Sequence, residues 1–178
     1  MVSLRHSREL SFVILITLIS FPFLPITSCT PNMSIQATEI VPGLYMSDLY
    51  VAEHPATYTA LGITHVLSVM PGSVQFPKCA TPQVLQVPIR DQPFEELAGH
   101  LGKTTAFIND ALVRRGSVLV HCVQGMSRSA SVVSAYLIAT YGWSVKEAVE
   151  YVRSKSTNAF PNTGFVHQLQ EYRDTLRR

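Results

Sequence analysis

Short apolar runs alternate with longer amphipathic stretches over most of the chain. The runs are rich in Val, Ile and Leu and are bounded by Gly and Pro, as buried strands are, whereas the longer stretches place apolar residues on one helical face. The pattern predicts two short strands around a Pro-Gly turn within 40–47, further strands at 63–69, 84–89 and 118–121, and helices at 56–61, 94–115, 129–141, from 144 onward and at 162–176. This alternation indicates a single α/β domain with a central, mostly parallel sheet flanked by helices.

Residues with strong preferences for helix ends support these boundaries. Gly116 and Gly142 directly follow two of the predicted helices, where glycine is strongly favoured. Ser144 and Glu147 form a capping box at the start of the next helix. Asn162 is a suitable N-cap for the last one.

The stretch 118–129 combines a buried strand, a tight loop and the start of a helix. Cys122 lies at one end of the loop and Arg128 at the other, with Gly125 between them. Inward-facing loop N–H groups and a helix N-terminus attract an anion, and Arg128 can bind an anion through a bidentate pair of hydrogen bonds. The same field favours the thiolate form of Cys122, which is a nucleophile. The sequence therefore predicts an anion site with a reactive thiol, at the strand end where α/β sheets bind ligands.

The motif His121-Cys122-x5-Arg128-Ser129 resembles that of the cysteine-dependent protein tyrosine phosphatases, and the surrounding chain resembles their small dual-specificity branch. The resemblance extends over roughly 38–177 and includes the stretches 42–45, 62–67, 148–153 and 161–169. It implies a protein tyrosine phosphatase-like fold, with a catalytic domain at 37–178.

The resemblance assigns roles to the residues of this motif. Cys122 is the nucleophile, and Ser129 helps its thiolate to leave in the second step. His121 supports the loop by hydrogen bonding and is not the proton donor. The phosphate-binding positions are Val123, Gln124, Gly125, Met126, Ser127 and Arg128. A buried inert cysteine and an ordinary helical serine are the alternatives for Cys122 and Ser129.

Asp91 is the candidate general acid, because the departing alkoxide or phenoxide needs a proton. It follows a predicted strand and lies 31 residues before Cys122, about the separation that the family shows. Glu95 and Glu96 are the nearby alternatives, although both are expected in the first turn of a helix, where carboxylates favour the helix dipole.

The resemblance implies metal-independent, cofactor-free hydrolysis of phosphotyrosine and phosphoserine or phosphothreonine in phosphoproteins. Phosphoinositides are less favoured, because lipid phosphatases often carry two lysines in the loop and this chain has none there. A phosphoprotein-binding module without turnover is the rival from another class, but such relatives usually lack the Cys or the acid. An arsenate reductase would require further redox cysteines near the loop, and a sulfurtransferase would not require Asp91.

Composition narrows the partners. The 178 residues carry a net charge of only +2, which does not favour nucleic acid as a partner. The three cysteines, Cys29, Cys79 and Cys122, form neither a CxxC pair nor a zinc pattern. Such low usage fits a reducing compartment, hence an intracellular (cytoplasmic) location. A protective disulfide between Cys79 and Cys122 and the oligomeric state remain open.

Residues 1–36 are predicted to form a hydrophobic leader and linker outside the fold. The segment 10–26 is almost wholly apolar and follows Arg5 and Arg8. A cleaved secretory signal, a membrane anchor and a passive leader all fit this pattern, so membrane association and a secretory route are alternatives to the cytoplasmic location.

Overall fold

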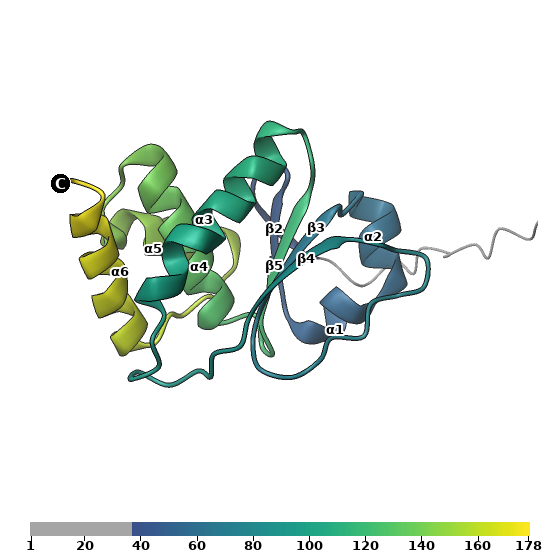
Figure 1. The fold of residues 1–178 in the computed structure, drawn as a ribbon, viewed down its shortest axis with the longest axis horizontal. Coiled ribbons are helices and arrows are strands. Elements are labelled where there is room, and N and C mark those ends of the chain that lie inside the picture. The colour runs from purple at the N-terminus through teal and green to yellow at the C-terminus, as the bar shows by residue number, and fades with distance from the viewer. Residues whose placement is uncertain (1–36) are drawn as a thin grey trace, which may run out of the picture.

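The computed structural model describes residues 37–178, which form a central sheet with helices on both faces (Figure 1). The strands are β1 (Thr38–Val41), β2 (Leu44–Ser47), β3 (His65–Val69), β4 (Gln83–Val87) and β5 (Val118–His121). The helices are α1 (Leu49–Glu53), α2 (Pro55–Leu61), α3 (Ala98–Val113), α4 (Arg128–Tyr141), α5 (Val145–Lys155) and α6 (Thr163–Thr175).

The sheet has the strand order β1-β2-β5-β3-β4, which places β5 at its centre. Only the β1–β2 pair is antiparallel, while β5 runs parallel to both β2 and β3. The predicted fold class, an α/β domain with a mostly parallel sheet, is therefore confirmed. The predicted strand 118–121 has the bounds of β5, and it ends directly before Cys122.

Alternate side chains of β5 enter two separate cores. Val118 and Val120 pack in the large cluster under α3 to α6, whereas Leu119 packs in a smaller cluster with α1 and α2. Because strand residues alternate between the two faces of a sheet, a strand that is apolar throughout must be covered on both sides. Figure 1 shows this arrangement, with α3 to α6 on one side of the sheet and α1 and α2 on the other.

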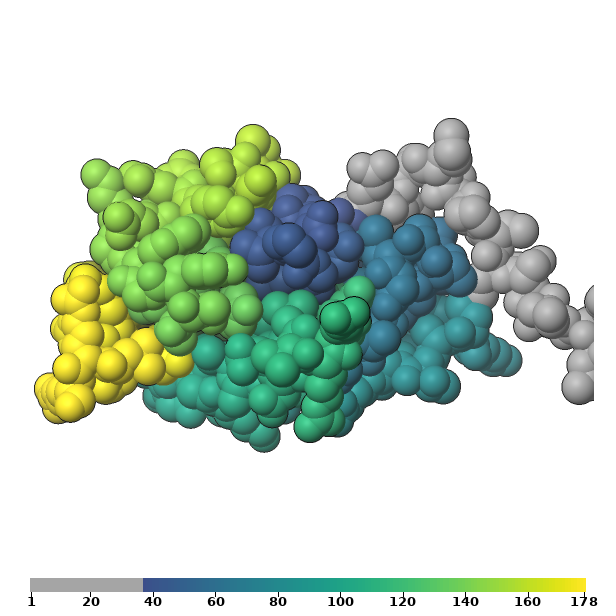
Figure 2. Space-filling view, turned by 90° about the horizontal axis from the view of Figure 1, so that it is seen from above, coloured from purple at the N-terminus to yellow at the C-terminus, as the bar shows by residue number. Residues whose placement is uncertain are grey.

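The β1–β2 hairpin lies between α5 on one side and the end of α3 on the other (Figure 2). Tyr151 of α5 donates a hydrogen bond of 3.2 Å to the carbonyl of Ile40. On the other side, Gly43 packs so closely against Leu112 of α3 that a Cβ would lie 3.2 Å from its side chain.

The main differences from the predicted elements are two boundaries and one helix. The helix expected at 94–115 begins only at Ala98, because the Gln168 side chain of α6 accepts hydrogen bonds from the N–H groups of Leu97 and Ala98. The strand expected at 84–89 ends at Val87, because Pro88 has no N–H to continue the ladder. The short helix α1 was not predicted; it depends on its Asp48 cap, which accepts from the Val51 N–H at 2.9 Å.

The predicted caps at Gly142, Ser144 and Asn162 are confirmed, but Gly116 does not cap α3, which ends at Val113 and is followed by Arg115 in the left-handed conformation. The Ser144 and Glu147 capping box is complete in both directions, and Asn162 accepts the N–H of Phe165 at 2.9 Å. The predicted leader, 1–36, lies outside the described residues. Within 37–178, no helix is both long and apolar enough to cross a membrane.

Gly164 and Gly102 provide a matched test of packing. A Cβ on Gly164 would fall on the backbone of Pro93, whereas a Cβ on Gly102 would meet nothing within 4 Å. We expect Gly164→Ala to lower the free energy of unfolding by about 1–3 kcal/mol, because the backbone of one segment must move. Gly102→Ala should raise it by about 0.5–1 kcal/mol, because alanine favours an exposed helix interior. Urea unfolding followed by circular dichroism measures both free energies. An unfolding free energy of Gly164→Ala equal to that of the wild type would contradict the close packing of Gly164 against Pro93.

Candidate active site

Cys122 directly follows β5 and begins the loop 122–127, which leads into α4. Its side chain is buried, and its Sγ lies 3.3 Å from the Oγ of Ser129 in the first turn of α4. Cys122 is a free thiol, so the disulfide with Cys79 that the sequence left open is not formed. The strand and the helix thus place a thiol and a hydroxyl in contact at the carboxyl end of the sheet.

The backbone N–H groups of residues 123–127 are available to a ligand. Those of residues 123–127 donate no hydrogen bond to any atom in the described part of the chain. Several unpaired N–H groups in one short loop next to a helix start create an attractive site for an oxyanion. The side chains of Val123, Gln124 and Met126 point outward and form the rim.

Gly125 allows the loop to lie against the end of β2. It has a φ of 68°, and a Cβ there would lie 2.9 Å from the carbonyl carbon of Ser47 and from the Asp48 nitrogen. The N–H of Leu49 also donates to the Val123 carbonyl at 3.2 Å. The loop therefore requires glycine at this position for both its conformation and its packing.

Arg128 is the first residue of α4, and its side chain is buried. One guanidinium nitrogen donates to the Ile89 carbonyl at 3.3 Å. Its Nε is buried without a hydrogen-bond partner in residues 37–178, and it lies 3.9 Å from Asp91 Oδ2. Arginine is seldom buried unless it is paired, so this incompletely paired guanidinium beside the open N–H groups favours an anionic ligand.

Asp91 lies beside this loop, on the segment that follows β4. Its Oδ1 accepts hydrogen bonds from Ser127 Oγ at 2.7 Å and from Asn162 Nδ2 at 2.8 Å. The Asn162 backbone N–H in turn donates to Ser127 Oγ at 3.1 Å. Two donors therefore hold one carboxylate oxygen of Asp91, while the other faces Arg128.

The two rival carboxylates are engaged elsewhere. Glu95 accepts the Arg90 backbone N–H at 3.3 Å, and Glu96 accepts the Gly99 N–H at 2.6 Å. Both residues precede α3, which corrects the expectation that they belong to its first turn. The structure thus brings Asp91, and neither glutamate, into contact with the loop.

His121 lies in the interior of the domain, directly before the loop. Its ring is buried, and its Nε2 lies 2.6 Å from the Ser68 hydroxyl on the neighbouring strand β3. Burial lowers the pKa of His121 to about 4, against smaller raising contributions from the Cys122 backbone, Glu53 and Asp48. The imidazole is therefore neutral near pH 7 and acts as a hydrogen-bonding spacer between two central strands.

Asn162 is the contact that sequence reasoning missed. Its side chain was predicted only as a helix cap, and its Oδ1 does cap α6. Its Nδ2 is also one of the two donors to Asp91, across a separation of 71 residues. Serine or aspartate would cap the helix equally well but would not supply this amide donor. The choice of asparagine among these cap residues was the only sequence indication of the second role.

The loop thus brings together a buried thiol, a buried guanidinium and open N–H groups, with a carboxylate beside them. Transfer of a phosphoryl group to a cysteine would require such groups.

Comparison with known proteins identifies the family. The family model described as "Dual specificity phosphatase, catalytic domain" matches residues 44–175. Dual specificity phosphatase 28 of Mus musculus is 39% identical over 140 residues, which cover 78% of this chain and 84% of that protein. Dual specificity protein phosphatase MPK-4 of Drosophila melanogaster is 36% identical over 139 residues, and this chain spans only 35% of its length.

A solved structure agrees with these matches. The human tyrosine phosphatase-like serine/threonine/tyrosine-interacting protein superposes with a TM-score of 0.76 at 32% identity, over 81% of this chain and 99% of that one. This chain belongs to the dual-specificity phosphatases of the protein tyrosine phosphatase superfamily. The predicted family and the predicted protein phosphatase class are confirmed.

The shifted pKa of His121 gives a test of pH-dependent stability. Because the folded pKa of about 4 lies below the ordinary 6.5, the unfolded chain binds more protons between these values, and stability falls as pH falls through this window. From about pH 7.5 to about pH 5, His121 should account for about 2 kcal/mol of lost unfolding free energy. The His121→Asn variant should not show this loss of unfolding free energy when its urea unfolding is compared at the two pH values. Equal pH dependence of wild type and variant would contradict the assignment.

Proposed function

We propose that residues 37–178 form the catalytic unit and hydrolyse phosphotyrosine and phosphoserine or phosphothreonine in phosphoproteins, with Cys122 as nucleophile, Arg128 as phosphate clamp and Asp91 as general acid. The observation that carries the proposal is the meeting of these three side chains at one loop with open N–H groups.

In the first step the Cys122 thiolate attacks phosphorus, and a sulfur–phosphorus bond forms as the bond to the ester oxygen breaks. Arg128 and the N–H groups of 123–127 stabilise the three equatorial oxygens of the transferring group. Asp91 gives its proton to the departing oxygen. Because Oδ1 already accepts two hydrogen bonds, the proton to be transferred is carried by Oδ2.

In the second step water hydrolyses the phosphocysteine. Asp91, now a carboxylate, takes a proton from the water, whose oxygen forms the new bond to phosphorus. The sulfur–phosphorus bond breaks, and the Ser129 hydroxyl, 3.3 Å from Sγ, donates a hydrogen bond to the departing thiolate. Inorganic phosphate leaves, and the thiolate is restored.

Phosphoproteins are the proposed substrates, and the cytoplasm is the proposed location, since a reducing compartment protects the Cys122 thiol from oxidation. Membrane association or secretory routing through 10–26 is the alternative location. Fractionation of cells expressing the full chain distinguishes them.

A binding module is the rival function, because one similar structure is a phosphatase-like interacting protein. Similarity of fold alone does not separate a catalyst from a binder. Catalysis is favoured here by the thiol, the clamp and the acid together, since a module that only held a phosphate would not need Asp91 beside the loop.

Leaving-group dependence tests the role of Asp91. Full-length Cys122→Ser should show no turnover under reducing conditions, because serine is a far weaker nucleophile at neutral pH. Asp91→Asn should lose about 10²–10⁴-fold in kcat with phenyl phosphate, whose leaving group needs a proton, and much less with p-nitrophenyl phosphate.

Glu95→Gln and Glu96→Gln are the matched controls, and both should retain wild-type leaving-group dependence. Inactivity of the reduced wild type would refute the enzyme proposal. Equal losses of Asp91→Asn on both esters would refute only the acid assignment.

Asn162→Ser isolates the amide donor of Asn162. Serine keeps the helix cap, so stability should change by less than about 0.5 kcal/mol. Without the Nδ2 donor, Asp91 is less well positioned, and kcat with phenyl phosphate should fall about tenfold while p-nitrophenyl phosphate is less affected. The double variant with Asp91→Asn should be no worse than Asp91→Asn alone. Additive losses would show that Asn162 does not act through Asp91.

A further inference from the structure

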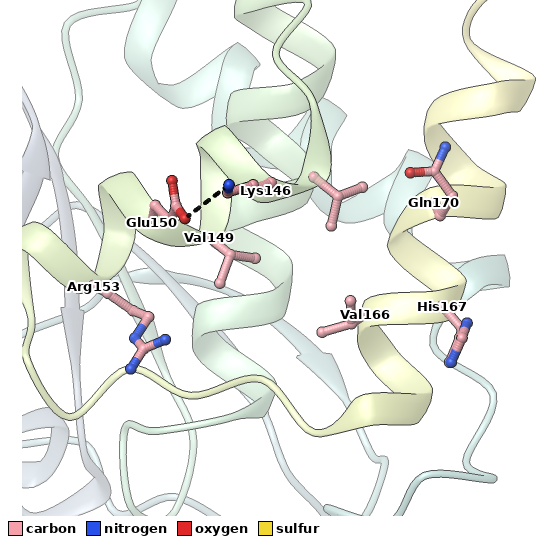
Figure 3. Close-up of a pocket in the computed structure, with 8 residues that line it drawn as sticks. Lys146, Val149, Glu150, Arg153, Val166, His167 and Gln170 are labelled. Carbon is pink, nitrogen blue, oxygen red and sulfur yellow. Dashed lines mark ion pairs between the residues drawn. The ribbon is translucent and has the colours of Figure 1, made fainter.

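A groove outside the catalytic loop lies between α5 and α6 (Figure 3). It has a volume of about 510 Å3. Three valines, Val145, Val149 and Val166, provide its apolar surface. The remaining lining is polar and consists of Lys146, Glu150, Arg153, His167 and Gln170.

Arg153 connects this groove to the mouth of the active site. Its guanidinium lies 4.9 Å from the ring centroid of Phe160, on the segment between α5 and α6. The Phe160 N–H donates to the carbonyl of Met126, in the catalytic loop, at 2.8 Å. The side chains of Phe160 and Met126 are 60% and 39% exposed, so large apolar groups lead from the rim of the site towards the groove.

The charges around the groove are not balanced. Lys146 and Glu150 form an ion pair at 3.9 Å, whereas no carboxylate within 37–178 pairs with Arg153. Stacking on Phe160 also restricts the Arg153 side chain, so less conformational freedom is lost when it binds an anion. An aliphatic side chain on the valines and an acidic group on Arg153 would satisfy both parts of the groove.

We propose that the α5–α6 groove docks a segment of the phosphoprotein substrate, one in which aliphatic and acidic residues lie next to each other. This inference rests on the proposed function and adds a substrate preference to it. The substrate is the favoured occupant because the apolar path begins at Met126, in the loop that would hold the phosphate. A chain that leaves the active site over Phe160 reaches Arg153 and then the valines.

Synthetic phosphotyrosine peptides with tails of about six residues test the proposal, since an extended tail of that length spans about 20 Å. Each peptide carries one of three tails, placed either before or after the phosphotyrosine. The first tail is composed of Leu and Glu, the second of Leu and Lys, and the third of Ser and Glu. The full chain is assayed for kcat/KM on each peptide and on p-nitrophenyl phosphate. Binding of the same peptides to Cys122→Ser is measured by fluorescence anisotropy.

The groove variants are Val166→Asp and Arg153→Glu. Their controls are Val113→Asp and Arg114→Glu, which make the same changes at exposed positions at the end of α3, remote from the loop. All four should hydrolyse p-nitrophenyl phosphate like the wild type, because this small ester does not reach the groove.

The wild type should prefer the Leu and Glu tail about tenfold over the other two in kcat/KM, on at least one side of the phosphotyrosine. Val166→Asp should remove this preference, Arg153→Glu should shift it to the Leu and Lys tail, and the controls should keep it. Equal use of all tails by an active wild type would overturn the docking inference alone. A concentration-dependent dimer that Val166→Asp dissociates would overturn it in favour of a second copy. An inactive wild type would overturn the proposed function, and the anisotropy would still report on the groove.

Discussion

Hydrogen bonds around Asp91 join three segments that lie far apart in the sequence. Ser127 and Asn162 both donate to one carboxylate oxygen of Asp91, and the Asn162 backbone donates to Ser127. The connection after β4, the catalytic loop and the start of α6 are thereby held together at one end of the sheet. The proposed chemistry depends on this hydrogen-bonded arrangement, because a general acid acts only within hydrogen-bonding reach of the leaving oxygen.

The sheet supplies the rigid support that an open loop requires. The N–H groups of 123–127 have no acceptor within the described residues, and the Arg128 guanidinium is only partly satisfied by the protein, so the surrounding packing must hold these groups in place. β5 is covered on both faces, and Gly125 allows the loop to rest against the end of β2. Buried, neutral His121 contributes by linking β5 to β3 without placing a charge behind the thiol.

Helices α5 and α6 and the segment between them contribute to the site as well as to the core. The N-terminus of α6 carries Asn162, and Gly164 allows the Pro93 segment to approach that helix closely. Beyond this contact, Phe160 and Arg153 extend the surface of the mouth into the groove between α5 and α6. One group of helices therefore positions the proposed acid and also presents a surface on which a substrate chain could be recognised.

Features that depend on neighbouring residues could be predicted from the sequence. The bounds of β5, the caps at Ser144 and Asn162, and the loop between Cys122 and Arg128 follow from apolar runs, cap preferences and spacing within a few residues. The start of α3 could not be predicted in this way, because the Gln168 side chain that determines it comes from another helix.

The sequence by itself determined the order of the elements and the place of the thiol and the guanidinium in one loop, since backbone propensities and short spacings act locally. It named Asp91 as the candidate acid and kept Glu95 and Glu96 as alternatives. Only the tertiary structure decided that Asp91 faces the loop and that Asn162 holds it there, because side chains 71 residues apart meet only when the helices pack against the sheet.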